Sequence, residues 1–308
     1  MSKEQTATSL ESRSNAESET MRNALTIDLE DYYHVSAFSE QMPVSHWNSA
    51  VSRIERNTNI LLDLLDSATC KATFFTLGWV AEQHPQLVRQ VADRGHEIAC
   101  HSLRHRTVYK MTRAEFHDDT RQAKMLLEDC SGTPVVGYRA PSFSITEKSL
   151  WALEVLAALG FTFDSSIFPV THPNYGIPSF GRDARRIDTP SGPIVEFPMT
   201  VLEFLGRRSP FGGGAYLRFL PYWFTRWGVR FLNATEGRPV CVYLHPWELD
   251  PEQPRLSGSL TSRMRHYVGL SKTPAKFARL VREFEFGTLG AMLDRVEPSA
   301  ISGETTAA

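Results

Sequence analysis

The sequence lacks the features that mark disulfide-rich, membrane-spanning and nucleic-acid-binding proteins. Its 308 residues contain only four cysteines, scattered without a Cys-x-x-Cys pair, which argues against a disulfide scaffold or a cysteine-ligated metal site. The formal net charge of −2 gives no general attraction to nucleic acids, so no nucleic-acid partner is expected. No run of about 18 apolar residues is present, so no integral membrane segment is expected.

The N-terminal residues also lack the apolar stretch of a secretory signal. Residues 1–22 are rich in Ser, Thr and Glu, and they carry too few apolar side chains to offset chain entropy on folding. We predict disordered tails at residues 1–22 and 297–308, and one domain at 23–296 with a C-terminal extension from about residue 246. A cytoplasmic location follows. A peripheral position at the inner membrane, through residues 221–227, is the alternative to packing of those aromatic residues inside the domain.

Short β-rich runs alternate with longer helical patterns along the chain. This alternation predicts a parallel sheet closed into a (β/α) barrel, with a doubly wound open sheet as the runner-up. Thr112 and Glu115 form a capping-box pattern, and residues 168–188 and 207–214 are expected to be long loops. The expected strands are 24–29, 72–76, 97–100, 135–138, 162–163, 194–197 and 240–244, and the expected helices are 53–66, 84–94, 112–130, 146–159 and 221–235.

Two histidines four residues apart follow the expected strand at 97–100. In a helical turn, this spacing places the rings of His101 and His105 on the same side of the chain, where both can face one metal ion. The alternative is a pair of surface histidines beside Arg104 and Arg106. The pair therefore predicts a metal site whose third ligand and general base come from elsewhere in the sequence.

Other unusual polar residues also lie at the ends of expected strands, where barrel enzymes have their active sites. Asp28, Glu30 and Asp31 end the first strand, and strand alternation places Asp28 and Glu30 on one face. Arg139 ends the fourth strand and could pair with one of these carboxylates, while His245 ends the last. The alternatives are a solvated acidic loop, a surface arginine and a capped core histidine.

Taken in order, these motifs resemble a known family. An Asp-bearing first strand, His-Ser-x-x-His, Arg-x-Pro, Asp-Ser and Leu-x-His resemble the NodB-type polysaccharide deacetylases, carbohydrate esterase family 4, over residues 25–245. Gly-Gly-Gly-Ala-Tyr at 212–216 and His-Pro-Trp-Glu-Leu-Asp at 245–250 resemble the branch found with exosortase-type exopolysaccharide gene clusters. The resemblance implies a distorted (β/α)7–8 barrel and metal-dependent removal of N-acetyl groups from N-acetylhexosamine units of a polysaccharide or its precursor.

The resemblance also implies a ligand set. His101 and His105 would bind the metal and Asp28 would be the general base. Leu29 stands where most members have a second aspartate, so the third ligand is either Glu30, at the spacing of variant members, or Asp31. Two imidazoles and a carboxylate suit one Zn²⁺ ion, with Co²⁺, Ni²⁺ or Mn²⁺ as alternatives.

The remaining roles are carried over in the same way. Arg139 would hold Asp28 ionised, and protonated His245 would donate to the leaving amine while Asp164 orients its ring. The backbone N–H of Ser142, after Pro141, would stabilise the oxyanion. The candidates for contact with the glycan substrate are Leu244, Trp247, Tyr175 and Tyr216.

Two other functions fit the same fold. One is the opening of cyclic amides such as ureides or imides, which the intact histidine pair disfavours. The other is a catalytically silent carbohydrate-binding protein, which the retention of Asp28, Arg139 and His245 disfavours.

Overall fold

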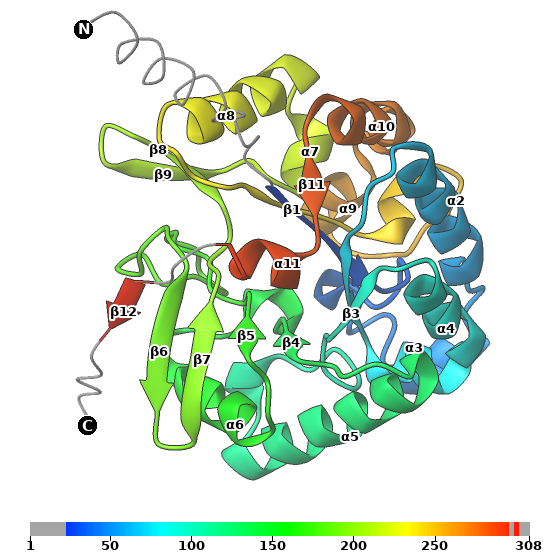
Figure 1. Cartoon of the computed structure of the whole chain (residues 1–308). Helices are drawn as coiled ribbons and strands as arrows, with labels where there is room; N and C mark the ends of the chain where they lie inside the picture. The colour runs from blue at the N-terminus through cyan, green and yellow to red at the C-terminus, as the bar shows by residue number, and fades with distance from the viewer. Residues whose placement is uncertain (1–22, 296–298, 302–308) are drawn as a thin grey trace, which may run out of the picture.

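The computed structural model describes residues 23–295 and 299–301 as a mixed α/β protein in which helices surround a curved sheet (Figure 1). Seven strands of this sheet run parallel to their neighbours, in the order β10-β1-β2-β3-β4-β5-β7. The arrangement confirms the expected distorted (β/α) barrel. These strands are β1 (Asn23–Leu29), β2 (Thr73–Thr76), β3 (Glu97–Cys100), β4 (Gly137–Tyr138), β5 (Phe163–Asp164), β7 (Gly192–Glu196) and β10 (Cys241–Leu244).

Several strands depart from the regular pattern. β6 (Arg185–Thr189) is antiparallel to β7, and β8 (Val201–Phe204) and β9 (Arg207–Pro210) form a separate hairpin. The predicted loops at 168–188 and 207–214 are therefore wrong where β6 and β9 form. These strands form through backbone pairing, and their sequences show no alternation of apolar residues. β11 (Phe286–Gly287) adds a short parallel pairing to β1.

One strand falls inside a predicted tail. β12 (Ser299–Ile301) pairs in parallel with β6 at the edge of the sheet. The prediction of disorder is therefore wrong for these three residues. The rest of that tail, and the predicted tail at 1–22, lie outside the described residues.

The helices largely follow the predicted segments. α5 begins after the expected capping box, in which the Thr112 side chain accepts from the Glu115 backbone, and Gly132, directly after its last residue, has the left-handed conformation. Within the described part of the chain, no helix is both long and apolar enough to cross a membrane. The helices are α2 (Ile54–Ser67), α3 (Gly78–Gln83), α4 (Pro85–Asp93), α5 (Arg113–Ser131), α6 (Trp151–Ala158), α7 (Ala215–Phe219), α8 (Tyr222–Ala234), α9 (Leu260–Tyr267), α10 (Thr273–Glu283) and α11 (Leu289–Leu293).

Strand alternation divides the buried side chains into two clusters. In β1, Leu25 and Ile27 belong to the larger cluster between the sheet and the helices, whereas Ala24 belongs to the cluster inside the barrel. α11 closes the barrel interior at the amino-terminal ends of the strands, where Leu289 and Met292 join the inner cluster. The carboxyl-terminal ends of the strands carry the polar residues of the site.

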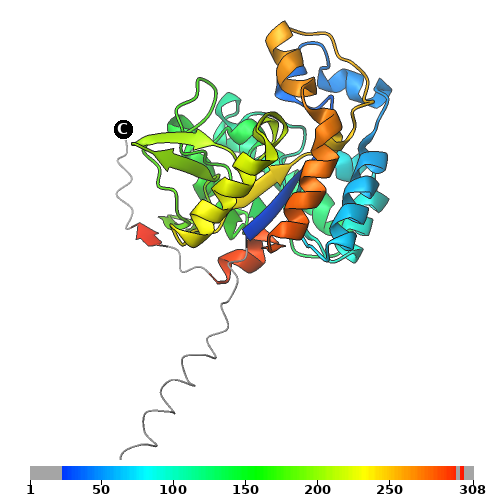
Figure 2. The ribbon, with the colours of Figure 1, turned by 90° about the horizontal axis from the view of Figure 1, so that it is seen from above.

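The rim at this end is built from segments far apart in sequence. Figure 2 shows the chain after β1 and helix α9 close together at the end toward which β1 points. The short 3-10 helix η1 (Ser36–Phe38) brings Phe38 edge-on to His266 of α9, with ring centroids 5.1 Å apart. The segment after β1 and helix α9, far apart in sequence, therefore border the same site.

Candidate active site

The two histidines singled out by their spacing lie together, but not in a helical turn. His101 continues the inward positions of β3 after Ala99, while Cys100 belongs to the outer cluster. After it, Ser102 and His105 adopt left-handed backbone conformations with φ of 68° and 53°, and Ser102 Oγ accepts the His105 backbone N–H at 3.0 Å. The predicted helical turn is thus wrong, although the ring centroids are 5.5 Å apart.

Hydrogen bonds orient both imidazoles. His101 Nδ1 lies 2.8 Å from the carbonyl oxygen of Arg139. Because a carbonyl only accepts, Nδ1 carries the proton and Nε2 keeps its lone pair, as in metal-binding histidines. His105 Nδ1 faces Ser36 Oγ at 3.4 Å, which leaves Nε2 directed at Glu30. Burial lowers the pKa of His101 to about 4, so its ring is neutral at neutral pH.

The structure separates the two candidates for the third ligand. Asp31 Oδ1 accepts from the Tyr32 backbone, and its Oδ2 accepts from Ser52 and the Arg53 backbone. The prediction of Asp31 as an alternative ligand is therefore wrong, because its oxygens accept hydrogen bonds that fix the chain at the start of α2. Glu30 instead joins His101 and His105, and the possible ligand atoms of the three all lie within 4.8 Å of one another.

Glu30 has the environment of a carboxylate that needs a cation. Its Oε2 is buried without a hydrogen bond in the described structure and lies 3.0 Å from His105 Nε2. Burial opposes its ionised form, but the neighbouring imidazoles, above all His105, lower the pKa of this carboxyl. Two imidazoles and one carboxylate match the donor set of catalytic zinc sites, so the residues present fit a divalent metal.

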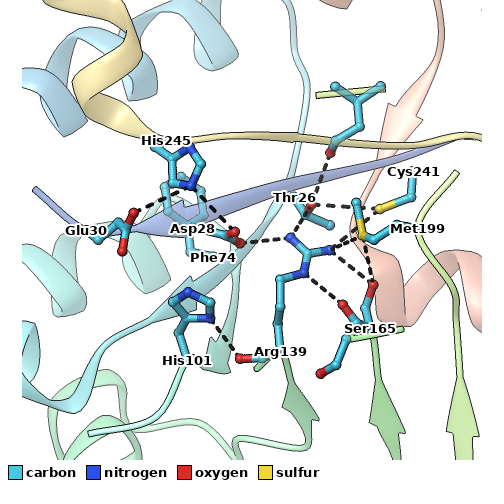
Figure 3. Close-up of polar contacts among 12 residues, drawn as sticks. Thr26, Asp28, Glu30, Phe74, His101, Arg139, Ser165, Met199, Cys241 and His245 are labelled. Carbon is cyan, nitrogen blue, oxygen red and sulfur yellow. Dashed lines mark hydrogen bonds and ion pairs between the residues drawn. The ribbon is translucent and has the colours of Figure 1, made fainter. Parts of the chain in front are cut away.

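Asp28 and Arg139 form a buried ion pair beside this cluster (Figure 3). The Arg139 guanidinium is fully buried and donates to Asp28 Oδ1 and Thr26 Oγ1, each at 2.8 Å. It also donates to the backbone oxygen and hydroxyl of Ser165 and lies over the Phe75 ring, 4.1 Å from its centroid. These contacts compensate the buried charges and fix one carboxylate oxygen. The structure thus brings together Asp28 and Arg139, the pair expected from the sequence.

The other Asp28 oxygen faces His245, which follows β10. His245 Nε2 lies 3.8 Å from Asp28 Oδ2 and 3.5 Å from Glu30 Oε1. Its Nδ1 lies 2.7 Å from Glu248 Oε1. Burial alone would lower the pKa of this imidazole, but the hydrogen bond and charge of Glu248, with the charges of Glu30 and Asp28, raise it to about 9. His245 is therefore an imidazolium at neutral pH.

Asp164 does not hold His245, and that predicted role is wrong. Phe163 and Ser165 point into the barrel, so alternation turns Asp164 outward. There Asp164 accepts from the Ser166 hydroxyl at 2.6 Å and forms a hydrogen bond with Glu196. Burial raises the pKa of both carboxyls, so this pair retains a proton. Ser166 Oγ in turn accepts the Ala140 backbone N–H at 2.7 Å.

The predicted oxyanion turn lies at the site. Pro141 is buried and Ser142 is half-buried, and Ser142 and Phe143 both have φ of 54°. Left-handed conformations in residues other than glycine are strained, and they persist where the surroundings fix them, commonly at active sites. Ser142 Oγ lies 2.8 Å from Ser36 Oγ, which links this turn to the segment facing His105.

The structure corrects two of the predicted substrate contacts. Trp247 is only 4% exposed, and its ring is stacked between those of His245 and His266, so neither face can stack on a sugar. Leu244 is fully buried in the outer cluster and offers no exposed surface. Tyr175 and Tyr216 are half-buried, and Tyr175 stacks on His172 with ring centroids 3.7 Å apart.

Sequence reasoning missed two residues that contact the predicted ones. Glu248 lies within a motif that marks the resemblance, and its distance of three residues from His245 is the spacing of a capping box, which is the signal that could have revealed it. Ser36 has no such signal, because its contacts with His105 and Ser142 depend on the path of the chain after β1.

The fold and the site together define an α/β-barrel protein with a candidate metal centre at the carboxyl-terminal ends of its strands. Two family models match the chain in succession. Residues 44–163, here the deacetylase segment, match "Polysaccharide deacetylase", and residues 165–294, here the DUF3473 segment, match "Domain of unknown function (DUF3473)". His101, His105 and Arg139 lie in the first and His245 in the second, whereas Asp28 and Glu30 precede both.

Known proteins agree with this match. A peptidoglycan-N-acetylglucosamine deacetylase of Bacillus cereus is 34% identical over 95 residues, covering 30% of this chain and 34% of that protein. A chitooligosaccharide deacetylase of Bradyrhizobium is 31% identical over 98 residues, covering 32% of this chain and 42% of that protein. The chain thus spans well under half the length of these curated relatives.

A crystal structure from Mycobacterium smegmatis, assigned as a polysaccharide deacetylase, has the same fold. It superposes with a TM-score of 0.59 at 18% identity, over 92% of this chain and 96% of that one. Residues 44–163 are therefore similar to polysaccharide deacetylases, and the shared fold agrees with this similarity.

Proposed function

We propose that this protein is a metal-dependent hydrolase that removes N-acetyl groups from N-acetylhexosamine units of a polysaccharide or its precursor. The observation that carries the proposal is the convergence of the Glu30, His101 and His105 cluster with a fixed carboxylate, Asp28, and an imidazolium, His245. A carboxylate base and an imidazolium acid beside a metal site are the groups that amide hydrolysis requires. The names of the relatives, which act on peptidoglycan and chitooligosaccharides, support this substrate class.

Glu30, His101 and His105 would hold one divalent metal ion. Zn²⁺ suits these nitrogen and oxygen donors best, with Co²⁺, Ni²⁺ or Mn²⁺ as alternatives. When bound, the ion supplies Lewis-acid polarisation of the acetyl carbonyl and of the attacking water. The hydrogen bond from His101 Nδ1 to the Arg139 carbonyl keeps Nε2 available as a ligand.

The chain's own residues then move the protons. Asp28 takes a proton from the attacking water, whose oxygen forms a bond to the acetyl carbon. Arg139 fixes one oxygen of Asp28 and so orients the other, and the Ser142 backbone N–H is the proposed donor to the oxyanion. His245 gives its proton to the sugar nitrogen as the carbon–nitrogen bond breaks, which releases acetate and a free amine.

The biological setting is part of the proposal. The resemblance of residues 245–250 to the exosortase-associated branch supports a role in exopolysaccharide biosynthesis. An N-acetylated glycan or glycan precursor is the proposed partner, met in the cytoplasm or at the inner membrane surface.

Acetate release from an N-acetylglucosamine oligomer tests the proposal. We expect the purified protein to release acetate, to stop after chelation and to recover with Zn²⁺. His101→Ala should be inactive, while His117→Ala, at a half-buried histidine of α5 outside the site, should match the wild type. Hydrolysis of a cyclic ureide instead of the oligomer would identify the cyclic-amide activity, and metal-independent oligomer binding without hydrolysis would identify a silent carbohydrate-binding protein.

A further inference from the structure

We propose that Glu248, fixed by Arg218, is the positioning residue for His245, so that the DUF3473 segment supplies the support of the proton donor. This inference rests on the proposed deacetylation and names residues that the family resemblance did not assign. Three groups of contacts carry it: those of Glu248 with His245, those of Arg218 with Glu248, and the stacking of aromatic rings on the imidazole.

Glu248 contacts His245 through a single oxygen. Its Oε1 accepts the His245 backbone N–H at 3.1 Å and lies 2.7 Å from the imidazole Nδ1. A carboxylate only accepts, so Nδ1 carries a proton and the ring cannot turn over without losing this bond. With Nδ1 fixed, Nε2 is the ring atom that faces Asp28 and Glu30.

The second oxygen of Glu248 distinguishes this arrangement from a simple capping box. Oε2 lies 3.3 Å from Arg218 Nη1, and the two residues are 0% and 4% exposed. A capping box needs no buried cation, and withdrawing two charges from water is costly unless each is well compensated. The Arg218 guanidinium is itself held by the backbone oxygens of His266 and Arg265, to which it donates at 3.1 and 2.6 Å.

An aromatic ring stacked on one face of the His245 imidazole restricts its movement. Trp247 stacks on His245 with ring centroids 5.0 Å apart, and His266 covers the other face of Trp247 at 4.1 Å. The Arg218 guanidinium lies 5.1 Å from the Trp247 ring centroid. The same arginine therefore supports both the acid that fixes Nδ1 and the ring that fixes the imidazole plane.

Glu248→Gln tests the proposal because it keeps the shape of the side chain. The single amide oxygen cannot accept from both Arg218 and His245. Turned toward the buried cation, it would leave the NH₂ facing Nδ1, which would then lose its proton. We expect kcat for acetate release to fall about 100-fold, the scale of an acid–base contribution, with KM within about twofold. Glu252→Gln, in the same segment with a 76% exposed side chain, is the matched control and should behave as the wild type.

A spectroscopic readout makes the test independent of turnover. Long-range ¹H–¹⁵N spectra of histidine-labelled protein, with His245→Asn to assign the signals, should show a protonated Nδ1 in the wild type and its loss in Glu248→Gln. Arg218→Lys keeps a cation but loses the fork, and we expect an intermediate loss of kcat, on the order of tenfold. Circular dichroism melting checks that each variant is folded.

The outcomes separate the two proposals. A wild type that releases no acetate would refute the deacetylase function, while the ¹⁵N signals would still report whether Glu248 fixes His245. An active wild type with unchanged kcat and an unchanged Nδ1 signal in folded Glu248→Gln would overturn the positioning role. If Glu248→Gln does not fold, wild-type kcat in Arg218→Lys would overturn it instead.

Discussion

The deacetylase segment and the DUF3473 segment contribute to one site in different ways. In the first, short parallel strands alternate with helices and place His101 and Arg139 at strand ends. The second contains the hairpins and short helices, yet it returns to the barrel through β10, which pairs with β1 in parallel and carries His245 to the same end. The regular part thus supplies the two histidines of the candidate metal cluster, and the irregular part supplies the imidazole of His245.

Neither segment holds the complete site alone. Asp28 lies in β1 and Glu30 directly follows it, and β1 lies between β2 and β10 and therefore between the two segments. Arg139 reaches Asp28 from one side and His245 reaches it from the other. The proposed chemistry therefore depends on closing the sheet around β1.

Asp28→Asn should have the largest effect, because Asp28 is the group that both halves contact. We expect kcat for acetate release to fall about 1,000-fold, while the protein retains its metal, since Asp28 is not part of the ligand cluster. Kinetics and elemental analysis on the same preparation measure both quantities. A variant that keeps its activity would remove Asp28 from the mechanism.

Arg139→Met should lower the free energy of unfolding, because it removes the buried cation that the deacetylase segment contributes. It would leave Asp28 buried without its partner, which costs about 3–5 kcal/mol in the free energy of unfolding. Urea denaturation of the variant and of Arg113→Met, an exposed arginine of α5 paired with Glu154, gives the comparison. Equal losses in the two variants would contradict the account of Arg139.

Glu196→Gln should have a smaller, pH-dependent effect. Burial raises the pKa of Glu196 in the folded protein, so its contribution to stability is full below the unfolded pKa and is lost as pH rises through the folded value. Glutamine does not titrate and keeps both contacts. The difference in Tm between the variant and the wild type should therefore shift in favour of the variant from pH 5 to pH 8. A difference in Tm that stays constant over this range would show that Glu196 is ionised.

Asp164→Asn should have the smallest effect on catalysis, which sharpens the contrast with Glu248. Its side chain contacts Ser166 and Glu196 rather than His245, so we expect kcat within about threefold of the wild type. Steady-state kinetics with the N-acetylglucosamine oligomer measures it. A loss as large as that expected for Glu248→Gln would restore the role first predicted for Asp164.

The sequence predicted the barrel and the convergence of Asp28, His101, Arg139 and His245. Alternation along a strand can be recognised in a short stretch of sequence, and the carboxyl ends of parallel strands meet at the same end of a barrel. It did not distinguish Glu30 from Asp31, since that choice depends on which carboxylate meets the backbone of α2. It also misplaced Asp164 and Trp247, although alternation along β5 would have turned Asp164 outward. The stacking of Trp247 depends on α9, which is distant in sequence.

Metal content and acetate release, measured on the same preparations of wild type, Glu30→Gln and His101→Ala, decide whether these residues form a catalytic metal centre. We expect about one divalent ion per chain and acetate release from the N-acetylglucosamine oligomer for the wild type, and the loss of both in each variant. A wild type that binds no divalent ion, or that releases acetate equally well after its metal is removed, would contradict the assignment of Glu30, His101 and His105 as the metal centre of a deacetylase.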